Sequence, residues 1–157
     1  MELITSLTNA KVKMALSLQQ KKYRDKYQLF ILEGIRNAEM VIAKNISVQM
    51  CFFTQKAFTN ERGKSILEQL KCPCFEVPEH IYQKISDTQS PQGLMLILPI
   101  QNHNLDDLAT INKSGLYLIL DRLQDPGNIG TIIRTADAMG VKAIICLNGT
   151  ADIYSPK

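Results

Sequence analysis

The sequence has few residues of the kinds that hold metal ions. Among its 157 residues are four cysteines and two histidines. The cysteines include a Cys-Pro-Cys at 72–74 but no Cys-x-x-Cys pair, and neither His80 nor His103 stands at a ligand-like spacing. We therefore expect no metal site. Cys51 and Cys146 fall within apolar runs, so we expect them to be small buried residues, which suits a reducing compartment.

Long apolar runs are also lacking, although the apolar fraction of 45% is typical of proteins that bury a core. The longest run is far shorter than the roughly 20 residues that cross a bilayer. The first residues, MELITSLTNAK, do not place a positive segment before an apolar one, as a targeting signal would. We therefore expect a cytoplasmic protein with no membrane anchor.

The glycine pattern excludes two common nucleotide-binding loops. In the stretch DPGNIG, Gly127 and Gly130 are three residues apart. This spacing fits neither Gly-x-Gly-x-x-Gly nor the phosphate loop that ends in Gly-Lys-Ser/Thr. We predict that this turn binds neither a dinucleotide nor a nucleoside triphosphate.

Positive charge gathers at the front of a chain whose net charge is only +3. Residues 1–45 hold eight lysines and arginines against four acidic residues, whereas residues 46–100 are balanced. Residues 101–157 hold five basic and six acidic residues. A polyanion should therefore meet the N-terminal part first. A charged face that is merely solvated is the alternative.

Short apolar runs alternate with helical patterns over residues 1–100, which favours an α/β sheet. Thr8 or Asn9 is expected to cap the N-terminus of a first helix, in which apolar residues such as Val12 and Ala15 recur at helical spacing. The polar stretch KKYRDKYQ that follows is interpreted as a loop. The expected helices cover 8–20, 35–44, 61–71 and 78–87, and the expected strands cover 29–34, 48–54, 74–77 and 93–100.

A polar, asparagine-rich stretch over 101–114 is interpreted as a linker between two domains. The first domain covers 1–100, and the second module covers 115–157. The second module shows two strand-like runs, LYLILD and VKAIICL, with one helix between them. Two strands and one helix cannot bury both faces of a parallel sheet. We therefore expect this module to be the first part of a larger domain.

The helix of the second module follows the carboxyl end of a strand, where free helix N–H groups collect ligands in open α/β sheets. An apolar stripe is expected to pack on the sheet, while Arg134 turns to the rim. In a purely structural interpretation, Asn128 caps the helix and Arg134 pairs with Asp137. Gly140 then ends the helix. The stripe consists of Ile129, Ile132, Ile133, Ala136 and Met139.

The stretch LDRLQDPGNIGTIIRTADAMGVKAIICL resembles the first motif of the SpoU (TrmH-like) family of RNA ribose 2'-O-methyltransferases. Upstream, TSLTNAKVK, KKYRDKYQLFILEG with the following Arg36, and SPQGLMLIL resemble the small RNA-binding domain of many members. The resemblance covers nearly the whole chain. The hallmark Asp-Pro-x-Asn-x-Gly followed by Arg-x-Ala is matched by Asp125, Pro126, Asn128, Gly130, Arg134 and Ala136.

This resemblance implies an α/β protein in which a ribosomal-protein-like RNA-binding domain precedes the first part of a parallel-sheet methyltransferase domain with a trefoil knot. It also implies S-adenosylmethionine as the methyl donor and a homodimer for the complete protein. The family's second and third motifs, which form the knot around the cofactor, do not occur in this sequence. We therefore expect a truncated chain that binds no cofactor by itself, with cofactor-binding residues beyond Lys157.

The resemblance further implies that Arg134 is the catalytic residue of the complete enzyme and that Asn128 supports the site. Arginine side chains are effectively always protonated in proteins. We therefore interpret Arg134 as a charged clamp on a phosphate that also stabilises the developing alkoxide, rather than as a general base.

RNA-binding residues are expected at the front of the chain, where Tyr23 and Tyr27 stand among basic residues. Positive charge binds phosphates, and aromatic faces stack on the bases of single-stranded or looped RNA. Ribosomal RNA is the expected substrate and tRNA the alternative, and a non-catalytic RNA-binding module is the alternative to an enzyme. The expected RNA-binding residues are Lys11, Lys13, Lys21, Lys22, Arg24 and Arg36.

Overall fold

Alternating strands and helices build two separate units in the computed structural model, which describes residues 1–102 and 114–156. One unit consists of Met1–Ile100 with Tyr154–Pro156, and the other of Gln101–Ile153. Most of the expected linker over 101–114 lies outside the described residues, so the proposed domain boundaries stay a prediction. Each unit is described by itself.

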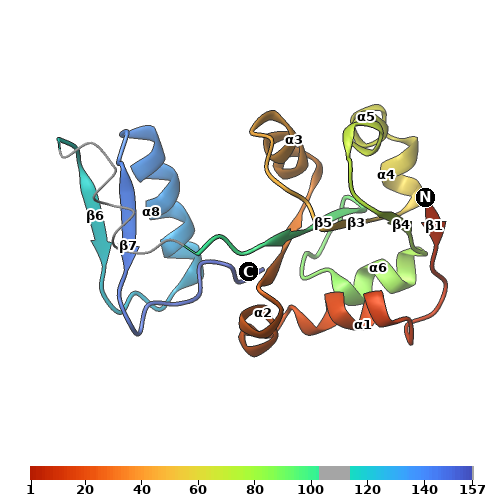
Figure 1. Ribbon diagram of the computed structural model, residues 1–157, viewed down its shortest axis with the longest axis horizontal. Helices are drawn as coiled ribbons and strands as arrows, with labels where there is room; N and C mark the ends of the chain where they lie inside the picture. Colours follow the sequence, from red (N-terminus) through yellow and green to blue (C-terminus); the bar gives the residue numbers. More distant parts are fainter. Residues whose placement is uncertain (103–113, 157) are drawn as a thin grey trace. The chain divides into compact units, whose positions relative to one another are not determined.

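The first unit is built on a five-stranded mixed sheet with the order β1-β4-β3-β5-β2 (Figure 1). β4 is parallel to both β1 and β3, whereas β5 is antiparallel to both β3 and β2. Its strands are β1 (Glu2–Leu3), β2 (Leu29–Glu33), β3 (Met50–Phe53), β4 (Cys74–Glu76) and β5 (Leu94–Pro99).

Helices cover both faces of this sheet, with α1 and α6 on one side and α3, α4 and α5 on the other (Figure 1). The apolar run of β5 is explained by this arrangement. Met95 and Ile97 are buried on the α1 side, and Leu94 and Leu96 on the α3 side. The helices are α1 (Ala10–Ser17), α2 (Lys21–Tyr27), α3 (Ile35–Ala43), α4 (Gln55–Thr59), α5 (Glu61–Gln69) and α6 (Glu79–Ile85).

All the helices and strands expected in this unit are present, and the Asn9 side chain caps α1 by accepting from the Lys11 N–H. The interpretation of residues 21–28 as a loop is wrong, because Lys21–Tyr27 form α2. The short elements β1 and α4 had no clear signal in the sequence. Cys51 is buried as expected.

Arg24 explains why the polar stretch is helical. Its side chain is only 3% exposed, and Nη1 donates to the carbonyls of Leu18 and Gln19 at 2.7 and 2.9 Å. These carbonyls lie at the C-terminal end of α1, where helix carbonyls lack partners within the helix. The buried guanidinium therefore supplies hydrogen-bond donors to the free carbonyls at the end of α1, and these bonds hold α2 against α1.

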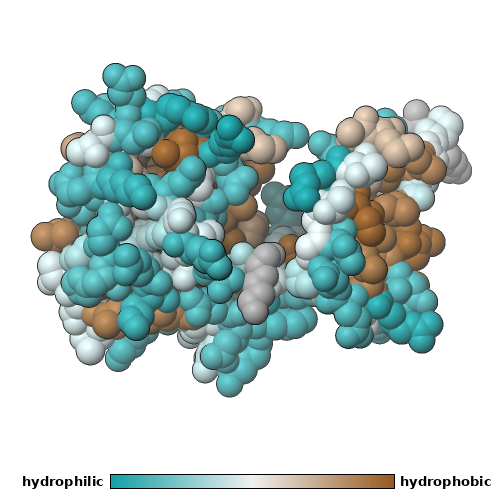
Figure 2. All heavy atoms as spheres, turned by 180° about the vertical axis from the view of Figure 1, so that it is seen from behind, coloured by the Kyte–Doolittle hydropathy of each residue, from teal (hydrophilic) through white to brown (hydrophobic). Residues whose placement is uncertain are grey.

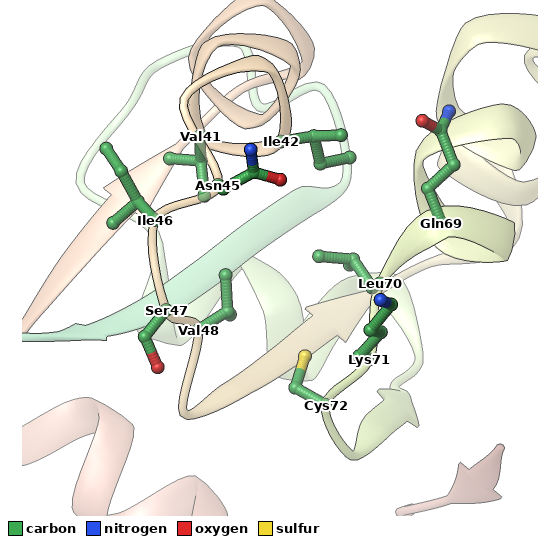
Figure 3. Close-up of a pocket in the computed structure, with 10 residues that line it drawn as sticks. All are labelled: Val41, Ile42, Asn45, Ile46, Ser47, Val48, Gln69, Leu70, Lys71 and Cys72. Carbon is green, nitrogen blue, oxygen red and sulfur yellow. The ribbon is translucent and has the colours of Figure 1, made fainter.

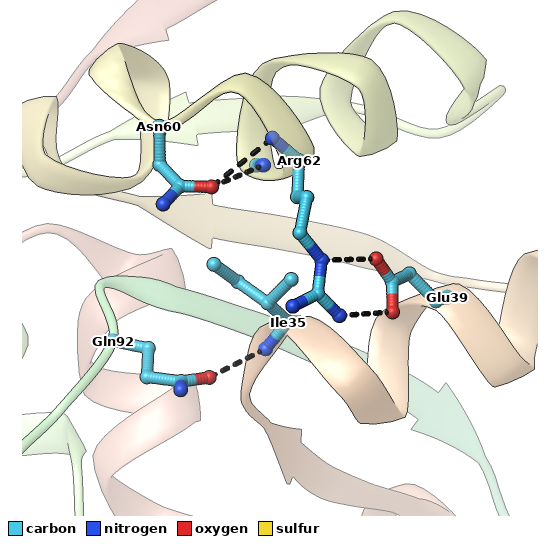
Figure 4. Close-up of polar contacts among 6 residues, drawn as sticks. Ile35, Glu39, Asn60, Arg62 and Gln92 are labelled. Carbon is cyan, nitrogen blue, oxygen red and sulfur yellow. Dashed lines mark hydrogen bonds and ion pairs between the residues drawn. The ribbon is translucent and has the colours of Figure 1, made fainter.

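Polar contacts join α3 to α5 (Figure 4). Arg62 donates from Nε and Nη2 to the two carboxylate oxygens of Glu39 at 2.8 and 2.6 Å. The hydrogen bond from Arg62 lowers the pKa of Glu39. Asn60 caps α5 by accepting from the N–H groups of Arg62 and Gly63. A Cβ added at Gly63 would collide with the carbonyl oxygen of Ala57, so α4 and α5 need a glycine there.

The second unit contains β6 (Tyr117–Leu120), α8 (Pro126–Ala138) and β7 (Ala143–Cys146), and the two strands are parallel, as expected. Two predictions of burial are wrong. Met139, the C-cap residue of α8, is 68% exposed, and Cys146 is exposed at the end of β7, which pairs only with β6 among the residues that the structure describes.

Apolar side chains gather on the surface of the second unit (Figure 2). Ile119 is 60% exposed, and Leu116 and Leu147 are exposed as well. Apolar patches of this kind mark surfaces that bind another protein element. No helix within residues 1–102 and 114–156 has the length and apolarity needed to cross a membrane.

Candidate active site and RNA interface

Asp125 organises the turn between β6 and α8. Its Oδ1 accepts from the N–H groups of Gly127 and Asn128 at 2.6 and 3.0 Å. Pro126 stands at the first helical position, where its lack of an N–H costs nothing and its fixed φ favours the helix. The N-cap is therefore Asp125, and the expectation that Asn128 caps the helix is wrong.

Because the Asp125 side chain caps α8, the Asn128 side chain is not used as a cap. Its backbone N–H is bound by Asp125, while its side chain is exposed and makes no hydrogen bond to any residue that the structure describes. An exposed amide in the first turn of a helix can both donate to and accept from a ligand. The position is thus suited to the supporting role that the resemblance implies.

Arg134 lies on the exposed side of α8 and folds back toward the start of the helix. Its Nη2 donates to Thr131 Oγ1 at 3.1 Å, and Thr131 Oγ1 donates to the Gly127 carbonyl at 3.0 Å. A Cβ added at Gly130 would lie 3.5 Å from Nη1 of Arg134. The expected ion pair with Asp137 does not form between these two described residues. The guanidinium is therefore held beside the turn and open to solvent.

A second exposed arginine, which the sequence analysis missed, follows β6. Arg122 donates from Nε and Nη2 to Asp121 at 3.1 and 3.0 Å. Its φ of 51° is in the left-handed region, which is uncommon for a residue other than glycine. A Cβ at Gly149, in the loop after β7, would lie 2.9 Å from Arg122 Cγ. No sequence pattern predicts this backbone conformation, because it depends on the packing of the loop after β6 against the loop after β7.

Hydrogen bonds hold these two loops together at the carboxyl ends of the parallel strands. Thr150 Oγ1 donates to the Leu120 carbonyl at 3.0 Å, and the Ala151 N–H donates to the Leu123 carbonyl at 2.8 Å. In open parallel sheets, this is the edge at which ligands bind. Asn128, the Arg134 guanidinium and the hydrogen-bonded loop after β7 therefore lie near this edge of the two strands.

One groove of the second unit does not fit S-adenosylmethionine. The second unit has an open groove of about 370 Å³, but it is lined largely by apolar side chains and by no carboxylate, amide or basic group. The ammonium, carboxylate and sulfonium groups of that cofactor need polar partners. No cofactor-binding residue is therefore assigned. The groove is lined by Leu116, Tyr117, Leu118, Thr131, Ile132, Thr135, Ala136, Met139 and Val141.

Two open grooves, of about 360 and 450 Å³, lie between α3 and α5 in the first unit, and none of the expected site residues lines them. In the first groove, the end of α3 and the segment after α5 approach each other (Figure 3). Its lining residues are Val41, Ile42, Asn45, Ile46, Ser47, Val48, Gln69, Leu70, Lys71 and Cys72.

The expected RNA-binding residues are not all available to RNA. Lys11 pairs with Glu2 at 3.0 Å and lies 4.2 Å from the centroid of the Phe75 ring. Lys21 pairs with Asp25 at 2.7 Å. Arg24 is only 3% exposed, which is at odds with direct binding of phosphate.

The remaining basic residues lie on two faces of the first unit. Lys13 on α1 and Lys22 on α2 are exposed, and α1 covers one face of the sheet. Arg36 is exposed in the first turn of α3, which covers the other face. The structure therefore does not gather the expected residues into one patch.

Glu33, which the sequence analysis did not single out, fixes the segment 86–92. Its carboxylate accepts from the hydroxyls of Tyr82, Ser86 and Thr88 at distances of 2.8 to 3.2 Å. Burial, reinforced by the negative charge of Glu33, raises the pKa of Tyr82. The Gln92 side chain in turn accepts from the Ile35 N–H at 2.9 Å (Figure 4).

Two family models match separate parts of the chain. Residues 9–96 match the MRM3-like substrate binding domain, and residues 115–157 match the SpoU rRNA Methylase family. The chain is 33% identical to the 23S rRNA (guanosine(2553)-2'-O)-methyltransferase RlmP of Bacillus subtilis, over 100% of this chain and 59% of that protein. It is 31% identical to the mitochondrial rRNA methyltransferase 3 of Xenopus laevis, over 88% of this chain and 33% of that protein.

A solved structure, that of the AdoMet-bound rRNA methyltransferase from Sinorhizobium meliloti, is similar with a TM-score of 0.81 at 32% identity. The likeness covers 98% of this chain and 57% of that chain, so this chain spans only part of its relatives. It confirms the predicted fold class. The substrate-binding match covers more than half of the chain, and the second match contains the Asp125 turn and Arg134. The chain therefore belongs to the SpoU family of RNA 2'-O-methyltransferases.

Proposed function

We propose that the protein containing this chain transfers a methyl group from S-adenosylmethionine to a ribose 2'-hydroxyl of ribosomal RNA. The printed names of the Bacillus and Xenopus relatives support ribosomal RNA as the substrate. The activity is assigned to the complete protein, because the chain spans only 59% of the Bacillus enzyme.

The observation that carries the proposal is the placement of Arg134. Its exposed guanidinium is held by Thr131 beside the Asp125 turn, at the carboxyl end of a parallel strand. A guanidinium there can bind two phosphate oxygens of RNA through two parallel N–H···O hydrogen bonds. Loss of the 2'-hydroxyl proton leaves negative charge on oxygen, which a fixed cation nearby stabilises. Asn128, with its free amide, is proposed to orient the ribose.

The first unit is proposed to bind the RNA. Its family match to a substrate-binding domain and the excess of basic residues over residues 1–45 support this role. A ribosomal RNA substrate implies that the protein works in the compartment where ribosomes are assembled. A homodimer, which the resemblance to the family implies, is proposed for the complete protein and is tested by its sedimentation.

A methyl-transfer assay with the complete protein tests the proposal. The substrate is RNA isolated from a strain that lacks the gene for this protein, so that the target ribose is unmethylated. We expect the wild-type protein to methylate ribosomal RNA, and Arg134→Ala to lower the rate by about 100-fold or more. Arg134→Lys should restore part of the rate without a new dependence on pH. Arg62→Gln, which changes an exposed arginine of α5 in the first unit, is the matched control.

Two results would count against the proposal. A wild-type protein that methylates no RNA would overturn the assigned activity. A rescue by Arg134→Lys that rises steeply with pH would support proton abstraction at position 134, and would overturn the role of a charged clamp.

A further inference from the structure

Helix α2 carries two tyrosines on one side, four residues apart. The Tyr23 and Tyr27 rings are nearly parallel, with an interplanar angle of 15° and centroids 6.2 Å apart. Tyr27 is 40% exposed and Tyr23 is half-buried. An ordered pair of aromatic rings at the surface offers flat apolar area without the entropy cost of ordering it upon binding.

Each ring is accompanied by a lysine of the same helix. The Lys22 ammonium lies 4.8 Å from the centroid of Tyr23, and the Lys26 ammonium 5.3 Å from that of Tyr27. Lys21 is different, because it is paired with Asp25. Lys22 and Lys26 are in no ion pair with residues that the structure describes, so their charge is available to an anion.

The helix is also fixed in place. Arg24, on the buried side of α2, binds the carbonyls of Leu18 and Gln19 at the end of α1. In Figure 1, α2 lies directly after α1 at the margin of the first unit. The surface formed by Lys22, Tyr23, Lys26 and Tyr27, here called the tyrosine face, is therefore held by a buried hydrogen-bonded anchor.

We infer that the tyrosine face is a stacking site for unpaired bases of the RNA substrate, with Lys22 and Lys26 on the neighbouring phosphates. This inference rests on the proposed function and narrows the substrate at this site to a single-stranded or looped segment. A base that stacks on a ring takes the place of the lysine beside it, and the freed ammonium can then bind phosphate. A duplex hides all of its base faces except those of the two terminal pairs, so its binding depends on the two lysines.

Binding of the full chain to a short unstructured RNA and to a blunt RNA duplex, each labelled with fluorescein, tests the inference. We expect Tyr27→Leu to weaken binding of the unstructured RNA by about tenfold and to leave binding of the duplex unchanged. Because the chain has no tryptophan, quenching of its tyrosine emission by unlabelled unstructured RNA gives a second readout of stacking. Phe58→Leu, at an aromatic residue of α4 that is 37% exposed, is the matched control.

A second pair of variants separates this inference from the function on which it rests. Lys22→Glu and Lys26→Glu should each make the binding affinity for both RNAs depend less on the salt concentration. If they do so while Tyr27→Leu binds both RNAs like the wild type, the stacking site is wrong and RNA binding by this unit stands. If the wild-type chain binds neither RNA, the RNA-binding role proposed for this unit fails, and the stacking site fails with it. Unchanged thermal unfolding of Tyr27→Leu shows that a loss of affinity is not a loss of folding.

Discussion

The guanidinium of Arg24 donates to the carbonyl of Leu18 at 2.7 Å, so the second helix of the chain closes the end of the first. The bond joins residues that are six apart in sequence, and it is buried. A basic residue that stands within a charged run is thereby a structural residue, whereas its neighbours Lys22 and Lys26 remain at the surface.

Replacing Arg24 should destabilise the first unit. We expect Arg24→Met to lower the free energy of unfolding by about 2 to 4 kcal/mol, because two carbonyls lose a charged donor in a buried site. Urea denaturation of the chain measures this change. Lys13→Met, at an exposed position of α1, should change the free energy by less than about 0.5 kcal/mol. Equal losses in the two variants would contradict the capping role.

The N-cap of α8 can be tested by comparing two neighbouring substitutions. Asp125→Ala removes the acceptor for two backbone N–H groups, and should lower the local stability of α8 by about 1 kcal/mol. Asn128→Ala removes a side chain that does not cap the helix, and should not lower this stability. Amide hydrogen exchange within Pro126–Ala138 measures both effects. A larger loss in Asn128→Ala would show that Asn128 is the cap after all.

The stability of the first unit should fall at high pH. The pKa of Tyr82 is raised above its ordinary value of 10.0 by burial and by Glu33, so the folded state keeps its proton where the unfolded state loses it. The stabilisation is present below about pH 10 and decreases as the pH rises beyond that value. Tyr82→Phe should show a smaller decrease between neutral and alkaline pH, as measured by urea denaturation. An equal decrease in both proteins would contradict this assignment.

Two glycine-to-alanine substitutions in helices should have opposite effects. Gly63→Ala places a methyl group against the carbonyl of Ala57, so we expect a loss of about 1 to 3 kcal/mol. Gly130→Ala meets only the Arg134 side chain at 3.5 Å, so the better helix propensity of alanine should raise the stability of α8 by up to about 1 kcal/mol. Thermal unfolding reports the first effect, and amide exchange in α8 reports the second.

The sequence predicts most of the first unit because its apolar patterns are strong. The run GLMLILPI predicts β5, because a strand that is buried on both faces needs apolar residues at every position. The helix α2 was missed because KKYRDKYQ has no apolar stripe, and its anchor is a tertiary hydrogen bond of Arg24. The N-cap was placed at Asn128 instead of Asp125 because both residue types cap helices.

The candidate site was only partly predictable. The Asp-Pro turn and the exposure of Arg134 followed from the motif and from the position of the helix after a strand. The side-chain partner of Arg134 did not, because Thr131 and Asp137 are both three residues away and only the rotamer decides between them. The left-handed backbone of Arg122 depends on the loop after β7, which lies more than twenty residues further along the chain.

The position of β5 in the sheet has a consequence for synthesis on the ribosome. β2 and β3 do not pair with each other, and each pairs with β5, which is the last strand of this unit in the sequence. As the chain is made from its N-terminus, β2 must wait with its hydrogen-bonding edge unfilled until Leu94–Pro99 has left the exit tunnel. The nascent N-terminal unit therefore completes its sheet in one late step, and ribosomes stalled before that point should carry it in a form that proteases cut readily.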